Sequence, residues 1–174
     1  REGGSAILSG VVAAAGTSID SLADTVKSSE FNDAVKLLAG AETIYLLAQR
    51  RSFPVTTYLA YMFGKLKIRV HLVSSPFGVE AEQMAFASKA DSALAVSFSP
   101  YASPTIDHAQ ILNEQGVPIV SITDSAFSPL ASLSTLWFEV AESDFGGFRS
   151  LSATMALATA IAIAIVEERR ANRK

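Results

Sequence analysis

Short apolar runs recur along the chain and alternate with segments of helical periodicity. Continuous runs of five or six residues are typical of strands covered on both faces. The predicted strands span residues 43–48, 69–73, 93–98, 118–123 and 136–140. Helical segments at 55–67, 79–88 and 106–115 separate the first four of these strands. Because strands joined by right-handed helical crossovers run parallel, the pattern predicts a doubly wound α/β fold, a three-layer α/β/α sandwich with a five-stranded parallel sheet.

Helices are predicted at both ends of this alternation. Residues 7–27 repeat apolar side chains at steps of mostly three and four, which indicates one helical face formed by Leu8, Val11, Val12, Ile19, Leu22 and Val26. A short helix follows, capped by Ser29 or Asn32 and stopped by Gly40. The last helix, from about 147 to 170, is apolar almost all round. It is therefore expected to be buried on several sides, either by a partner subunit in a dimer, which we favour, or by the first helix.

Composition narrows the class of protein. The 174 residues fit a single domain, 1–174, with residues 1–28 as an N-terminal helix packing on it. The net charge of −3 provides no positive field for nucleic acid. The absence of cysteine excludes disulfides and thiolate chemistry and suits the cytoplasm. The apolar run 151–166 is shorter than the ~20 residues that a membrane span needs, so no membrane partner is expected.

Two loops after predicted strands carry side chains suited to a phosphate. Residues 48–54 include Arg50, Arg51 and Ser52, and residues 97–105 include Ser97, Ser99, Ser103 and Thr105. Ser97 and Ser99 share one side of an extended segment, so their hydroxyls can converge on one anion beside a helix N-terminus. One of Ser103 and Thr105 can instead cap that helix, and all four hydroxyl residues of the second loop are also typical of ordinary turns and caps.

Other polar residues offer alternatives. Glu80, Glu82 and His108 are candidates for the general base of an isomerase, although Glu80 also suits a helix N-terminus and His108 a partly exposed helix position. His71 lies in a predicted strand, as a core histidine would. Two histidines without cysteine give no support for a metal site, and no cofactor is expected. The remaining candidates can contact sugar hydroxyls or simply cap turns; they are Asp124, Ser125, Arg149 and Ser150.

The order of these motifs resembles a known family. The segments that carry the resemblance are 50–55 with 58–61, the Ser-x-Ser turn within 94–106, 118–124 and 128–131. Over about residues 30 to 170 they are similar to the sugar isomerase (SIS) domain of RpiR-type transcriptional regulators. The resemblance implies a flavodoxin-like, five-stranded parallel sheet that binds a phosphosugar in a dimer or larger oligomer. It also implies an N-terminal helix-turn-helix domain that contacts DNA; because the chain begins with Arg1, that domain is expected to be absent here.

The resemblance places Ser52, Ser97 and Ser99 at the serines of the family's phosphate loops. The sequence departs from those loops at four positions, where Ala48, Arg50 and Pro100 replace glycine and Ala102 replaces threonine. Arg50 or Arg51 can replace the lost backbone donors, or can form a solvated basic turn. The sequence thus favours a non-catalytic phosphosugar sensor in a transcriptional regulator; a phosphosugar isomerase and a domain that only dimerises are the alternatives.

Overall fold

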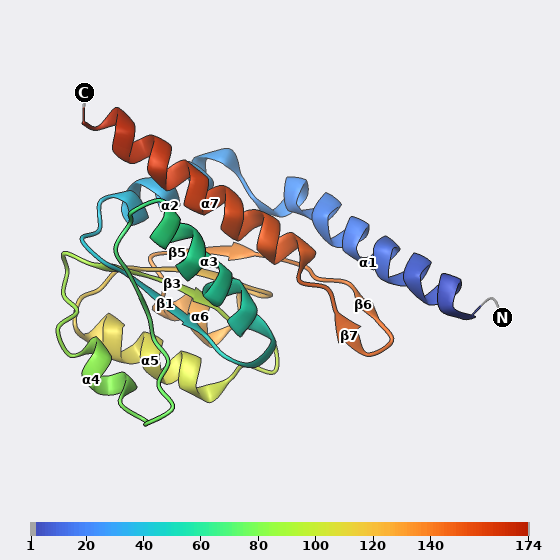
Figure 1. The fold of residues 1–174 in the computed structure, drawn as a ribbon, viewed down its shortest axis with the longest axis horizontal. Coiled ribbons are helices and arrows are strands. Elements are labelled where there is room, and N and C mark those ends of the chain that lie inside the picture. The colour runs from blue at the N-terminus through green and yellow to red at the C-terminus, as the bar shows by residue number, and fades with distance from the viewer. Residues whose placement is uncertain (1–2, 174) are drawn as a thin grey trace.

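The computed structural model describes residues 3–173 and contains the predicted parallel sheet (Figure 1). Its strands are β1 (Ile44–Ala48), β2 (Val70–Leu72), β3 (Ser92–Val96), β4 (Ile119–Thr123) and β5 (Leu136–Glu139). They lie in the order β2-β1-β3-β4-β5, and every neighbouring pair is parallel. The doubly wound, flavodoxin-like α/β prediction is confirmed, and the order reverses beside β1 and β3, where such folds hold ligands.

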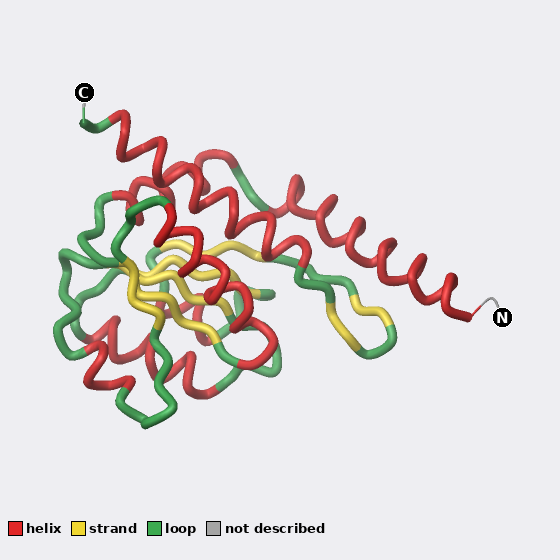
Figure 2. The backbone as a smooth tube through the Cα atoms, viewed as in Figure 1, coloured by secondary structure: helices red, strands yellow, loops and turns green. Residues whose placement is uncertain are grey.

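Helices cover both faces of the sheet, whose strands lie between the two helical layers in Figure 2. One face carries α2 (Ser28–Ala39), α3 (Phe53–Lys65) and α7 (Ser152–Ala171). The other carries α4 (Glu80–Met84), α5 (Ser103–Glu114) and α6 (Pro129–Leu133). Side chains of β1 alternate between these layers: Leu46 belongs to the first core and Leu47 to the second.

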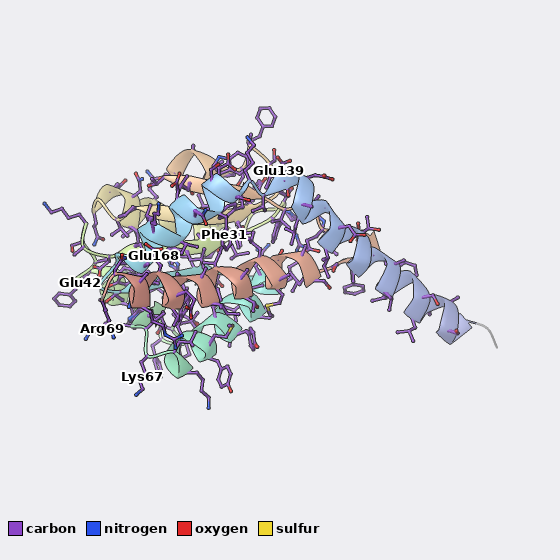
Figure 3. The ribbon with its side chains drawn as sticks, turned by 90° about the horizontal axis from the view of Figure 1, so that it is seen from above. Phe31, Glu42, Lys67, Arg69, Glu139 and Glu168 are labelled. Carbon is purple, nitrogen blue, oxygen red and sulfur yellow. The ribbon has the colours of Figure 1, made fainter. Side chains whose placement is uncertain are left out.

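Helix α7 is covered mainly from within the chain. It lies between α2 and α3 when the molecule is seen from above (Figure 3). Arg169 near its end donates from Nε to the carbonyl oxygen of Ala39 at 3.0 Å and from Nη2 to that of Ala41 at 2.8 Å. These bonds satisfy carbonyl groups at the end of α2, so they fasten the two helices together.

The last helix begins later than predicted. The sequence placed its start at about residue 147, whereas α7 begins at Ser152. A hairpin of β6 (Asp144–Phe145) and β7 (Phe148–Arg149) precedes it. Gly146 and Gly147 have φ values of 64° and 84°, as the two central residues of a tight hairpin turn require. The turn is closed by the Gly147 amide, which donates to Oδ1 of Asp144 at 3.1 Å.

Two further differences concern short helices. Helix α4 ends at Met84 instead of residue 88, because the Ala85 and Ala87 amides bond to carbonyls three residues back and tighten the chain into turns. Helix α6 was not predicted. The hydroxyl of Ser128 caps it by accepting from the Leu130 amide at 3.2 Å.

Helix α1 (Gly3–Thr25) extends away from the sheet (Figure 1). Of the apolar face predicted for residues 7–27, Leu22 and the following Val26 pack against the core. The other four residues of that face are exposed: Leu8, Val11, Val12 and Ile19. The helix contacts α7 and β6, and a Cβ atom at Gly10 would overlap the ring of Phe145. By length and composition alone α1 is also apolar enough to cross a membrane.

Candidate functional site

A cavity of about 240 Å³ lies where β1 and β3 end. It is lined by Gln49, Arg50, Arg51, Ser52, Ser97, Phe98, Pro100 and Ala102, so it joins the two loops that the sequence singled out. After β1 the chain turns through a single 3₁₀ turn, Arg50–Ser52, and enters α3 with Pro54 in its first turn. Arg50 holds a φ of 54° where the family pattern has glycine, so the loop keeps a left-handed backbone without glycine's freedom.

Two of the four predicted serines meet in this cavity. Ser52 and Ser97 are 3% and 4% exposed and come from different loops. Ser52 precedes α3 but makes no capping hydrogen bond through its side chain. A small ligand in the cavity would therefore meet two hydroxyls that can donate to it.

Ser99 is placed elsewhere. Strand β3 ends at Val96, so the alternation that would put Ser97 and Ser99 on one side does not continue through the loop. Ser99 is exposed and lines a neighbouring cavity, and its amide donates to Oδ2 of Asp124 at 2.9 Å. That amide is consequently not free to bind a phosphate.

Ser103 and Thr105 stand at the start of α5 but do not line the cavity. Ser103 is exposed, while Thr105 is fully buried with a hydroxyl that has no hydrogen-bond partner within residues 3–173. Neither caps α5, because the residue before the helix is Ala102 and no side chain makes a capping bond.

Arg51 is the most unusual side chain at the site. Its Nη1 and Nη2 atoms are buried and have no hydrogen-bond partner among the described residues. Cζ lies 5.2 Å from the centre of the Phe98 ring, a cation–π contact that fixes the guanidinium. Burial lowers the pKa of Arg51 and the charge of Arg149 lowers it further, while Asp124 and Glu142 act in the opposite direction. A buried guanidinium without an ion pair is costly, so an anion bound here would offset that cost.

Asp124 organises the loop beside the cavity, a larger role than the sequence suggested. Besides the Ser99 amide, its Oδ1 accepts from the Tyr101 hydroxyl at 2.6 Å, and its Oδ2 lies 3.7 Å from Nη1 of Arg149. Burial raises the pKa of Tyr101, and the hydrogen bond to Asp124 raises it further. The aspartate at the end of β4 was visible in the sequence, but its partners were not.

Glu142 is the other acidic side chain close to Arg51. Its Oε1 accepts from the amide and hydroxyl of Thr154 at 2.7 and 2.9 Å and so satisfies the first turn of α7. Its Oε2 is buried without a partner, yet it forms no ion pair with Arg51 within the described chain. Because Glu142 lies well before Ser152, where α7 begins, no local pattern in the sequence indicated this capping role.

The candidate bases of an isomerase lie outside the cavity. Glu80 Oε1 accepts from the Ser75 amide at 3.3 Å, Glu82 is exposed, and His108 is half-buried on α5. His71 packs in β2 against Tyr45, with ring centres 5.5 Å apart. Within residues 3–173 no group of three or more histidine, aspartate or glutamate side chains is placed to hold a metal ion.

His108 should lower the free energy of unfolding when the pH falls below neutral. Burial lowers the pKa of His108, an effect that Glu80 and Asp107 partly offset. The folded state then binds this proton less readily than the unfolded state. The histidine's contribution is present above its ordinary pKa of about 6.5 and is lost as pH falls through the lower, folded value. His108→Gln should flatten the fall in urea midpoint between about pH 7 and 5; an unchanged slope would contradict this assignment.

A family model described as the SIS domain matches residues 37–164. No curated protein matches. Several solved structures share the fold. The sugar isomerase domain of the RpiR transcription factor from Sphaerobacter thermophilus is 18% identical, with a TM-score of 0.85 over 98% of this chain and 93% of that one. The NanR protein of Vibrio vulnificus, complexed with ManNAc-6P, is 23% identical, with a TM-score of 0.81.

This chain covers 63% of NanR, and 94% of this chain is aligned to it. A protein of E. coli CFT073, solved with a bound ligand, is 20% identical, with a TM-score of 0.76 over 94% of this chain and 89% of that one. The family model spans well over half of the sequence and includes both cavity loops. The chain therefore belongs to the SIS domain family.

Proposed function

We propose that this chain is the effector-binding and dimerisation domain of a transcriptional regulator and that it senses a phosphorylated sugar. The observation that carries the proposal is the unpartnered Arg51 guanidinium beside the Ser52 and Ser97 hydroxyls in one cavity. Two structural neighbours support it, one being an RpiR transcription factor and the other being bound to ManNAc-6P.

The cavity suits binding better than catalysis. A phosphate offers several acceptor oxygens, which match a guanidinium fork and two hydroxyl donors. Proton transfer on a sugar needs a carboxylate or an imidazole within hydrogen-bond reach. The described residues that line the cavity include neither, and its titratable members are the arginines Arg50 and Arg51. We therefore assign the domain a non-catalytic role.

The β6–β7 hairpin connects the site with α1. On one side Arg149 of β7 pairs with Asp124. On the other side Phe145 of β6 packs against Gly10, and the Ser18 hydroxyl accepts from the Ser143 amide at 2.8 Å. A ligand that draws Arg149 or Arg51 toward itself would move the hairpin and thereby reorient α1. In the proposed regulator, α1 leads toward the DNA-binding domain and so transmits the change.

Helix α1 is the surface that we assign to a homodimer in the cytoplasm. Leu8, Val12 and Ile19 are 65%, 61% and 44% exposed, and they lie on one side of the helix. Such an apolar face is costly to leave in water, and a second copy of α1 would bury it. Pairing of such dimers into tetramers would use other surfaces.

Val12→Glu should dissociate the dimer. The charge would be placed in the apolar contact, so the dissociation constant should rise roughly 100-fold, as desolvating an unpaired carboxylate requires. Sedimentation velocity over a range of protein concentrations measures this change. Ala13→Glu is the matched control, because Ala13 is exposed on the adjacent face of the same helix. Equal dissociation by both variants, or flotation of the wild type with lipid vesicles, would contradict this assignment of α1.

Thermal unfolding against a panel of sugar phosphates tests the ligand class. A sugar phosphate should raise the Tm by mass action, and the corresponding free sugar should not. If no sugar phosphate has an effect, the domain only dimerises. Turnover of an aldose phosphate that is lost in Glu80→Gln, Glu82→Gln or His108→Gln would establish the isomerase instead.

A further inference from the structure

A second cavity of about 390 Å³ adjoins the first. It is lined by Arg51, Ser99, Pro100, Asp144, Gly147, Phe148, Arg149 and Leu151. Arg51 and Pro100 line both cavities, so these two side chains stand at the boundary between them. Its outer wall is the β6–β7 hairpin, which the phosphate-loop pattern of the sequence does not include.

The charges in this second cavity are only partly balanced. Arg149 is 38% exposed in its side chain, and its Nη1 lies 3.7 Å from Asp124, farther than the ~2.7–2.9 Å of a charge-assisted hydrogen bond. Asp124 already accepts two shorter bonds, from the Ser99 amide and the Tyr101 hydroxyl. Arg149 therefore retains guanidinium donors for another anion.

A second anion would also reduce the repulsion between two cations. Arg149 and Arg51 lie close enough for the charge of one to disfavour the charge of the other. Asp144 lines the same cavity, but its Oδ1 accepts from the Gly147 amide and holds the hairpin turn. With Asp124 and Asp144 nearby, a singly charged carboxylate meets less repulsion than a second phosphate, which carries between one and two negative charges.

We propose that the ligand is a phosphorylated sugar acid whose two ends occupy the two cavities. This inference rests on the proposed function, which places the phosphate at Arg51, Ser52 and Ser97. The carboxylate at the other end of the sugar chain binds Arg149, and the polyol between them spans the boundary beside Pro100. A sugar phosphate without a carboxylate would fill the first cavity, and Arg149 would then pair with Asp124 alone.

Calorimetric titration with 6-phosphogluconate and glucose 6-phosphate tests this directly, because the two ligands differ at C1, where only the first has a carboxylate. The wild type should bind 6-phosphogluconate about tenfold more tightly, the usual effect of one charge-assisted contact. Arg149→Gln should remove that preference and weaken glucose 6-phosphate much less than 6-phosphogluconate, because only the carboxylate contacts Arg149 directly. Arg170→Gln is the matched control, because Arg170 is an exposed arginine paired with Glu167 on α7. The unliganded Tm of each variant establishes that it is folded.

Each outcome separates the two proposals. Equal affinity of the wild type for both ligands would overturn the sugar-acid inference and leave the phosphosugar sensor in place. The same would follow if Arg149→Gln weakened both ligands equally, or if a sugar bisphosphate bound more tightly than 6-phosphogluconate. Failure of the wild type to bind 6-phosphogluconate, when another sugar phosphate of the thermal panel does bind, would overturn the sugar-acid inference alone. Failure of every sugar phosphate in that panel would overturn both proposals.

Discussion

Arg51→Met should abolish the response to sugar phosphates while leaving the unliganded domain at least as stable as the wild type. Methionine retains an unbranched apolar stem but removes the guanidinium, whose Nη1 and Nη2 have no partner in the described chain. Loss of the charge-assisted bonds to phosphate should weaken binding about 100-fold. Loss of an uncompensated buried charge should raise the free energy of unfolding by roughly 1 kcal/mol.

Titration calorimetry and urea unfolding together measure these opposite effects. Arg51→Lys is the informative companion, because lysine keeps the charge but lacks the fork, so its affinity should lie between those of the wild type and Arg51→Met. A structural role for Arg51 would make Arg51→Met less stable than the wild type. Such a loss of stability, or unchanged affinity, would contradict the assignment.

Phe63→Ala should produce a large loss of stability. Phe63 lies on α3 with none of its surface exposed, in the core that α3 shares with β1, β2 and α7. Truncating a buried phenylalanine leaves a cavity and costs about 3–5 kcal/mol, a large share of the ~5–15 kcal/mol that stabilises a domain. Because α3 begins directly after Ser52, the same packing also positions the first cavity loop.

Urea unfolding followed by circular dichroism measures this loss. Tyr61→Ala on the same helix is the control, since Tyr61 is 59% exposed and its removal should cost less than about 1 kcal/mol. Comparable destabilisation by both substitutions would show that α3 contributes through its own helicity and not through the core. A saturating sugar phosphate should partly restore the Tm of Phe63→Ala, provided that the site still forms.

The strands were readable from the sequence because each is buried on both faces. Runs such as Ile44–Ala48 and Ser92–Val96 are entirely buried, so nearly every side chain had to be small or apolar. The hairpin at residues 144–149 was not readable, because two residues per strand are too few for a periodic pattern. Helical periodicity also placed α1 but could not show which of its apolar residues would be covered.

The candidate site, too, was predictable only in part from the sequence. The sequence by itself determined that two polar loops follow strands of one parallel sheet, and chain order alone brings such loops to one edge. It therefore placed Arg51, Ser52 and Ser97 in one neighbourhood. Only the tertiary structure decided that the Ser99 amide donates to Asp124, that Thr105 is buried, and that Nη1 and Nη2 of Arg51 have no partner among the described residues. Those outcomes depend on the direction of each side chain and on hydrogen-bond partners distant in the sequence, which no local pattern specifies.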